Sequence, residues 1–270
     1  MFAKVAQKYR YSLILLRQLV ITDLKLRYQG SWLGYLWSLL RPLAFFVILY
    51  VIFGKFVKTL PGIDHAALYL LLGVVVWNYF AEVTNLSVAS IVGRGDLIRK
   101  INFPKYVIVL AGSFSALINL GISFVIVFAF MAFTGVAPNI DALWIVPSLI
   151  VELFIFAIAI AFFLSAVYVR LRDIGYIWEL FMQAAFYATP ILYSLSFVTN
   201  LTVQQGMMLN PVAQIIQDLR VTLIEPKAPD IGTVFGNEWV RLIPIAFVLA
   251  VTVIAAWYFK KRSKHFAEDV

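Results

Sequence analysis

Apolar positions along the chain gather into six long runs, separated by shorter segments that carry most of the charge. A helix needs about 20 predominantly apolar residues to cross the hydrocarbon core of a bilayer. The pattern therefore predicts an all-α integral membrane protein with six transmembrane helices. The predicted spans are Leu36–Phe56, Ala66–Val92, Tyr106–Thr134, Leu143–Val169, Ile174–Tyr193 and Val240–Phe259.

The N-terminal segment, residues 1–35, has a different pattern. Between Ser12 and Tyr28 apolar residues recur every three or four positions, which is the period of a helix with one apolar face. Charged residues interrupt the stripe, so we do not expect a span. We favour a helix lying in the lipid headgroup plane over a solvent-exposed basic tail. The residues that we assign to this interface helix are Asp23, Lys25, Arg27 and Tyr28.

The long connection Ser194–Trp239 is unusually apolar for a loop in water. Asn210-Pro211 reads as a turn that leads into a helix over Val212–Leu223. We expect two short re-entrant helices here, since irregular structure at membrane depth is tolerated where protein covers it. The chain is then a single transmembrane domain over 1–270. Its parts are the interface helix (1–35), spans one to five (36–193), the external re-entrant region (194–239), span six (240–259) and a tail (260–270).

Composition supports a membrane protein and excludes several kinds of site. Hydrophobic residues make up 63% and charged residues 13% of the chain, against about 25% charged in soluble domains. There are no cysteines and only two histidines, so a disulfide framework and a cysteine or histidine metal site are excluded. No phosphate-binding loop of the form GxxxxGK[ST] is present. We therefore expect no metal, no bound cofactor and no catalytic residue in this chain.

The basic residues are distributed unevenly between the two sides of the predicted membrane. With the N-terminus in the cytoplasm, the inside segments are 1–41, 93–105, 170–173 and 260–270, and they hold 17 of the 22 lysines and arginines. Such an excess marks cytoplasmic loops. Both termini are expected in the cytoplasm, and the net charge of +8 needs no nucleic-acid partner.

The cytoplasmic loop Gly93–Lys105 contains a candidate docking element. Asp96 to Lys100 can form a short helix with apolar residues at its centre, and Pro104 follows as a stop signal. Such a helix suits a groove on another protein, whereas a plain basic loop would only set topology. The loop by itself does not decide between these interpretations.

Aromatic residues inside the spans suggest a conduit for a polymer. Many lie away from the membrane interfaces where aromatics usually gather. Ring faces can stack on sugar rings, whereas ordinary helix packing or lipid contact is the alternative for each single residue. The candidate channel residues are Phe45, Phe46, Tyr50, Phe53, Trp178, Phe181, Phe186, Tyr187 and Tyr193.

Three acidic residues fall within the predicted spans, and such groups are functional candidates by default. Glu82 could contact a polar substrate or brace a neighbouring helix. Glu179 lies near the start of its span and is expected to pair with Arg170 or Arg172. Glu152 has no assigned role.

Four motifs connect these features to a known family: DLKLRY at Asp23–Tyr28, SWLGYLWSLLRP at Ser31–Pro42, RKINFP at Arg99–Pro104 and TPILY at Thr189–Tyr193. With them the chain resembles the membrane subunits of type-2 ABC exporters. Within that class it is most similar to permeases for lipid-linked polysaccharides such as O-antigen, teichoic acid or capsule. The resemblance extends over nearly the whole chain.

The resemblance implies a transport subunit rather than an enzyme, placed in a bacterial cytoplasmic membrane. It implies pairing with a second copy as a homodimer and docking of two copies of a P-loop ABC ATPase, which bind the ATP and magnesium. Two alternatives stay open: a type-2 exporter of drugs or small lipids, and a membrane glycosyl- or acyltransferase. The residues that would couple to the ATPase are Asp96, Leu97, Ile98, Arg99, Lys100, Phe103 and Pro104.

Overall fold

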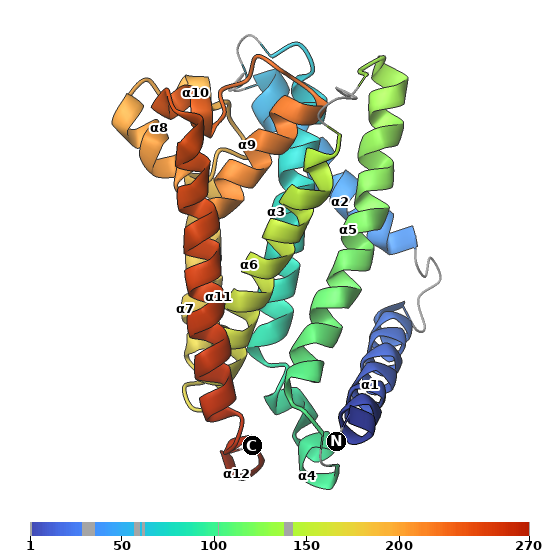
Figure 1. Cartoon of the computed structure of the whole chain (residues 1–270). Helices are drawn as coiled ribbons and strands as arrows, with labels where there is room; N and C mark the ends of the chain where they lie inside the picture. The colour runs from blue at the N-terminus through green and yellow to red at the C-terminus, as the bar shows by residue number, and fades with distance from the viewer. Residues whose placement is uncertain are drawn as a thin grey trace.

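The computed structural model describes residues 2–28, 36–56, 60, 63–101, 103–137 and 143–269. Every regular element within these ranges is a helix, and the longest helices stand side by side in one bundle (Figure 1). The all-α prediction is therefore confirmed for the described part of the chain.

The helices follow one another with short connections. Short 3₁₀ turns occur at Val92–Arg94, Leu195–Phe197 and Glu238–Arg241. The α-helices are α1 (Phe2–Tyr28), α2 (Leu36–Leu49, continued as a π-helix over Tyr50–Phe56), α3 (Ala66–Val88), α4 (Gly95–Lys100), α5 (Tyr106–Thr134), α6 (Ile145–Tyr168), α7 (Ile174–Ala188), α8 (Leu201–Met208), α9 (Pro211–Leu223), α10 (Ile231–Phe235), α11 (Leu242–Arg262) and α12 (Phe266–Asp269).

Four helices in the described ranges are long and apolar enough to cross a membrane: α3, α5, α6 and the segment Glu238–Arg262 that contains α11. They correspond to predicted spans two, three, four and six. Predicted span one is helical over its whole length, as α2 followed by the π-helix, but its apolar part is only Leu43–Phe53. Helix α7, with 15 residues, is shorter than predicted span five. The count of six spans stays a prediction for these two helices.

Local backbone chemistry explains why α7 is shorter than predicted. The helix ends at Ala188 instead of continuing to Tyr193, and Thr189 is extended with φ −86° and ψ 137°. Thr189 precedes Pro190, and the proline ring pushes the preceding residue out of the helical region. The TPILY motif is therefore a break in the helix.

Helix α3 lies at the centre of the bundle. Its first half is apolar on all sides, and the side chains from Leu68 to Val76 are buried. Helices α2, α5, α6, α7 and α9 all pack against it. A helix that is apolar all round lies either in a protein core or against lipid. Here protein covers 72% of the apolar window of α3, so α3 is the element on which the others assemble.

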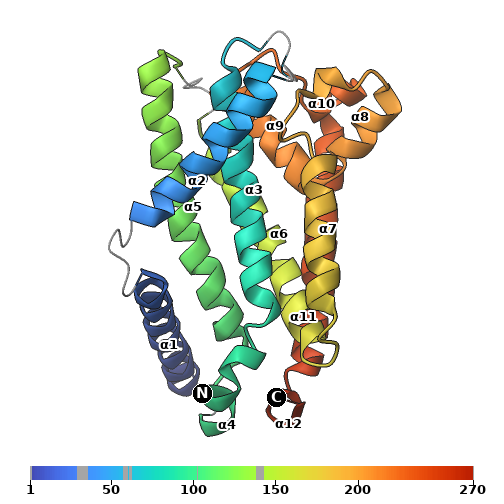
Figure 2. The same ribbon diagram turned by 180° about the vertical axis from the view of Figure 1, so that it is seen from behind.

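The two ends of the bundle differ in what they carry. Helices α4 and α12, both termini and the turn between α6 and α7 lie at one end, which we call the α4 end (Figures 1 and 2). Helices α8, α9 and α10 lie at the other, which we call the α9 end. The α4 end thus unites α4, the turn between α6 and α7 and both chain ends, all of which the charge pattern assigns to the cytoplasm.

Helix α1 packs on α5 at the α4 end. It has 27 residues and α5 has 29, yet both views draw α1 much shorter than α5 (Figures 1 and 2). The helix therefore runs across the bundle and not along it. A helix at the membrane surface needs this orientation.

Candidate functional site

The aromatic residues of α2 and α7 meet at the central helix. The ring centroid of Phe45 lies 6.2 Å from that of Phe186. Phe186 contacts Trp77 of α3 edge-on at 5.8 Å. Trp77 in turn contacts Phe80, which stacks on Phe156 of α6 at 5.4 Å. We call these five residues the aromatic seam; it joins predicted spans one and five through α3.

The structure divides the predicted channel residues into two groups. Phe46 is buried, stacks on Tyr50 and contacts Phe130 of α5 edge-on. By contrast, Phe181 is 55% exposed and Tyr187 is 66% exposed. Phe46 therefore packs two helices together, whereas the other two rings are largely exposed at the surface of the chain.

The remaining members of the predicted channel set are partly covered. Phe53 packs against the core at the π-helix, and Trp178 stacks on Phe181 with centroids 5.2 Å apart. The Tyr193 hydroxyl donates to the Tyr187 carbonyl at 3.2 Å. Sequence reasoning missed Trp77 and Phe80, although their spacing of three residues inside predicted span two was a usable signal.

Helix α4 is formed as the sequence predicts, one residue longer at its start. Its apolar residues Ile98 and Phe103 are buried in the chain's own core, and Leu97 and Pro104 are half-buried. Asp96, Arg99 and Lys100 are exposed. The surface that α4 presents is therefore charged, and its apolar centre anchors the loop to α12 and the bundle.

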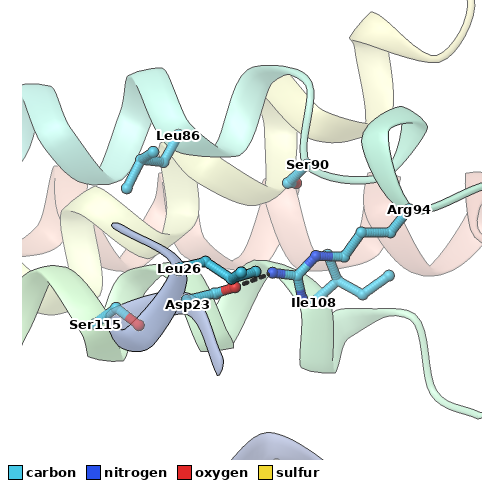
Figure 3. A pocket seen from close by; sticks show the side chains of 8 residues that line it. Asp23, Leu26, Leu86, Ser90, Arg94, Ile108 and Ser115 are labelled. Carbon is cyan, nitrogen blue, oxygen red and sulfur yellow. Dashed lines mark hydrogen bonds and ion pairs between the residues drawn. The ribbon is translucent and has the colours of Figure 1, made fainter. Parts of the chain in front are cut away.

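The interface helix is connected to this loop by one ion pair. Arg94, just before α4, donates through Nη2 to Asp23 Oδ1 at 2.5 Å (Figure 3). Both side chains are about one-quarter exposed. Lys25 is exposed, whereas the side chains of Arg27 and Tyr28 lie outside the described residues. The ion pair links the interface helix to the loop Gly93–Lys105, two segments that the sequence analysis treated separately.

At the α9 end, Arg220 of α9 is fully buried and holds three segments together. Its guanidinium donates to the carbonyls of Tyr69 at 3.1 Å, Pro190 at 2.6 Å and Ile191 at 2.9 Å. It also donates to Gln217 Oε1 at 2.8 Å and lies 3.6 Å from the Tyr69 ring centroid. We call this arrangement the Arg220 node; it ties α9 to α3 and to the helix break after α7.

The approach of Arg220 to α3 requires a glycine. A Cβ placed on Gly73 would lie 2.5 Å from Arg220 Nη2, which is closer than real Cβ contacts. Gln217 extends the node, because it accepts from the Tyr69 hydroxyl at 3.0 Å and donates to the Pro229 carbonyl at 3.0 Å. Sequence reasoning counted Arg220 only as a basic residue on the outside.

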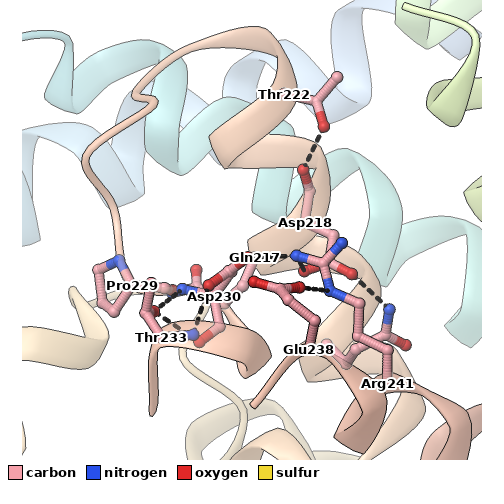
Figure 4. A network of polar contacts seen from close by, with 9 residues as sticks. Gln217, Asp218, Thr222, Pro229, Asp230, Thr233, Glu238 and Arg241 are labelled. Carbon is pink, nitrogen blue, oxygen red and sulfur yellow. Dashed lines mark hydrogen bonds and ion pairs between the residues drawn. The ribbon is translucent and has the colours of Figure 1, made fainter. Parts of the chain in front are cut away.

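A second polar cluster at this end surrounds Arg241 (Figure 4). Arg241 contacts the Asp230 carboxylate, lies 3.3 Å from Glu238 and 3.9 Å from Asp218. Burial raises the pKa of Asp218 to about 6, although Arg241 and the hydrogen bond from Gln214 act in the opposite direction. The cluster joins α9, α10 and the start of α11.

The acidic residues inside the spans have different surroundings. Glu82 accepts from Asn119 of α5 at 2.8 Å, so it braces a neighbouring helix. Glu152 Oε1 is buried and has no hydrogen-bond partner in the described structure. Glu179 is exposed and forms no ion pair with Arg170 or Arg172 among the described residues; the Arg172 guanidinium lies over the Tyr168 ring instead. The predicted Glu179 pairing is therefore wrong.

Comparison with known proteins places these features in context. A family model described as ABC-2 type transporter matches residues 14–224. The chain is 29% identical over 266 residues to the O-antigen export system permease protein RfbA of Klebsiella pneumoniae, covering 97% of this chain and 98% of the relative. It is 27% identical over 278 aligned residues to the O-antigen export system permease protein RfbA of Myxococcus xanthus, covering all of both chains.

The matched family region contains α3, the aromatic seam, the Asp23–Arg94 pair and the Arg220 node. Together with the four apolar helices that can span a bilayer, the match makes this chain a multi-pass membrane protein. It belongs to the ABC-2 type transporter family.

Proposed function

We propose that this chain is the permease subunit of an ATP-driven exporter that moves a lipid-linked polysaccharide across a bacterial cytoplasmic membrane. Relatives that match it from end to end carry the name of O-antigen export permeases. Export and not catalysis is the role in this proposal, and ATP with its magnesium binds to a separate ATPase partner.

The observation that carries the proposal is the aromatic seam together with its exposed neighbours. In Figure 2, α2 crosses in front of α3 and α7 stands beside α3; Phe45 of α2 and Phe181 and Tyr187 of α7 are exposed. Ring faces stack on flat ligands without demanding a fixed register. A second copy of the chain facing this surface would enclose a channel for the polysaccharide, so the proposal includes a homodimer.

We propose that the ATPase docks at the α4 end. The exposed side chains Asp96, Arg99 and Lys100 form the docking surface for the ATPase. Ile98 and Phe103, which are buried in the core below them, pass a displacement of α4 on to the bundle helices. Both termini and the α4 end face the cytoplasm in this proposal, in keeping with the charge distribution.

Export is tested by pairing exposed aromatic changes with a matched control. We expect Phe181→Ala combined with Tyr187→Ala, two exposed rings outside the aromatic seam, to slow the appearance of glycan at the cell surface with little change in melting temperature. Phe133→Ala on α5, where Phe133 is 89% exposed, should leave export intact. Equal export in all three chains would contradict the conduit, and altered sensitivity to amphipathic compounds with normal glycan would favour a small-molecule exporter.

Docking is tested by charge reversal. Arg99→Glu with Lys100→Glu should reduce copurification of the ATPase, because the exposed positive charge of α4 is inverted. Lys227→Glu, an exposed lysine at the α9 end, is the control and should retain the partner. Unchanged copurification of the double variant would remove α4 from the docking surface.

A further inference from the structure

A cavity of about 240 Å³ lies at the α4 end, beside the Asp23–Arg94 ion pair (Figure 3). It opens between α1, the end of α3 and the start of α5. Pockets for drug-sized ligands have roughly 300–1,000 Å³. The cavity therefore suits a lipid headgroup or another compact ligand, and it is too small for a glycan chain.

The polar groups around the cavity are complementary to a ligand that carries both a hydrogen-bond donor and an anionic acceptor. Arg94 Nη1 is buried and has no hydrogen-bond partner within the described structure, whereas its Nη2 is taken by Asp23. A buried donor without a partner is costly, and a guanidinium with a free N–H suits a phosphate oxygen.

The lining of the cavity also supplies acceptors. The Asp23 carboxylate can accept more bonds than the one from Arg94. The hydroxyls of Ser90 and Ser115 donate to the carbonyls of Ser87 and Ala111, so their oxygen lone pairs stay available as acceptors. A protonated amine has the three donors that these oxygens require.

The remaining walls are apolar, and two of them lie at the surface. Leu26 of α1 and Leu86 of α3 line the cavity and are largely exposed, and Ile108 is buried behind them. A Cβ added to Gly112 meets no atom within 4 Å, so this wall of α5 faces open space. An apolar mouth beside a helix that runs across the bundle suits acyl chains.

We propose that this cavity binds the headgroup of a phosphoethanolamine lipid. The phosphate accepts from Arg94 Nη1, and the ammonium donates to Asp23 and to the serine oxygens. The headgroup and the ion pair are each neutral overall. Phosphocholine lacks the N–H donors, and phosphoglycerol brings a net negative charge next to Asp23.

The test measures lipid retention by native mass spectrometry on the purified full-length chain. The chain is exposed separately to palmitoyl-oleoyl phosphatidylethanolamine, phosphatidylcholine and phosphatidylglycerol. Since one charge-assisted hydrogen bond changes affinity about tenfold, we expect about tenfold greater retention of the ethanolamine lipid. Equal retention of the choline lipid, or greater retention of the glycerol lipid, would overturn the proposal.

Two glycines of α5 provide a matched pair of variants. Gly112→Leu fills the cavity without touching either charge and should abolish the preference for the ethanolamine lipid. Gly121→Leu adds the same side chain where a Cβ also meets no atom within 4 Å, away from the cavity, and should bind like the natural chain. Identical retention by both variants would refute the site.

Asp23→Asn keeps the cavity and removes the partner of the ammonium. It should bring ethanolamine and choline lipids to equal retention, and it decides the matter where Gly112→Leu does not yield folded protein. A preference that survives Asp23→Asn contradicts the proposal. A soluble arm uses glycerophosphoethanolamine: thermal protection equal to that of the whole lipid would assign the site to a free phosphate ester and reject the lipid.

Discussion

The two ends of the bundle each use an arginine to join segments that lie far apart in the sequence, but they use it differently. Arg220 at the α9 end is fully buried, and its guanidinium bonds to four oxygens and covers an aromatic ring. Arg94 at the α4 end is one-quarter exposed and bonds to Asp23 alone among the described residues, beside a cavity.

This difference indicates which end can move with the smaller loss of free energy. To pull α9 away from α3 and from the break after α7, the carbonyls of Tyr69, Pro190 and Ile191 must lose their donor in a dry interior, where each unsatisfied group costs about 1–3 kcal/mol. A partly exposed ion pair contributes only about 0–1 kcal/mol. In the proposed mechanism, motion driven from α4 therefore reaches α1 through a weak ion pair, while the α9 end stays assembled.

The largest expected effect is at the Arg220 node. Arg220→Met removes the donor for three backbone carbonyls and Gln217, so we expect a loss of about 3–5 kcal/mol in unfolding free energy or failure to accumulate folded protein. Thermal melting in detergent measures it. Arg170→Met, at an exposed arginine, is the control; equal melting temperatures for the two variants would show that the node is dispensable.

The next effect comes from crowding the node. Gly73→Ala places a methyl group 2.5 Å from Arg220 Nη2, and the guanidinium cannot move aside without breaking its hydrogen bonds. Overpacking of this kind costs about 1–3 kcal/mol. Gly121→Ala on α5 serves as control because its Cβ position is open. A Gly73→Ala chain as stable as the control would mean that the node tolerates displacement.

The dependence of stability on pH tests the α9 end specifically, through Asp218. The pKa of Asp218 is raised to about 6, above its usual value of about 3.9, so the folded chain binds this proton more tightly than the unfolded chain. Its contribution is complete below about pH 4 and is lost as pH rises through 6, by up to about 3 kcal/mol.

Asp218→Asn should remove this slope between pH 4 and 6, as measured by melting temperature. The pKa of Asp230 is lowered: burial alone would raise it, but hydrogen bonds from Thr233 and the charge of Arg241 outweigh burial. Its stabilisation is lost as pH falls through that lowered pKa, outside the tested window. A slope that persists in Asp218→Asn would assign the titration to another group.

The smallest effect on stability is expected at the α4 end. Asp23→Arg or Arg94→Asp alone should change unfolding free energy by no more than about 1 kcal/mol, yet each should reduce export by uncoupling α1 from the loop. The double exchange restores the pair in reverse and should recover export. An export assay in cells checks this, and a double exchange no better than either single change would deny the ion pair a role in coupling.

Local patterns were sufficient to predict most helices. Apolar runs predicted α3, α5, α6 and α11, and an apolar centre between charged ends, followed by Pro104, predicted α4. Asn210-Pro211 predicted the start of α9, where the Asn210 side chain caps the helix by accepting from Val212 N–H at 3.0 Å. These signals act over a few residues, so they can be read without knowing the neighbours.

The pairings between distant residues were decided only by the tertiary structure. Asp23 and Arg94, or Arg220 and the carbonyls of Pro190 and Ile191, carry no mark in the sequence that assigns them to each other. The same holds for the division of the aromatic residues into buried Phe46 and exposed Tyr187. Hydrophobic burial is non-directional, so the sequence by itself determined which segments are helices in a membrane, and packing around α3 decided which side chains meet.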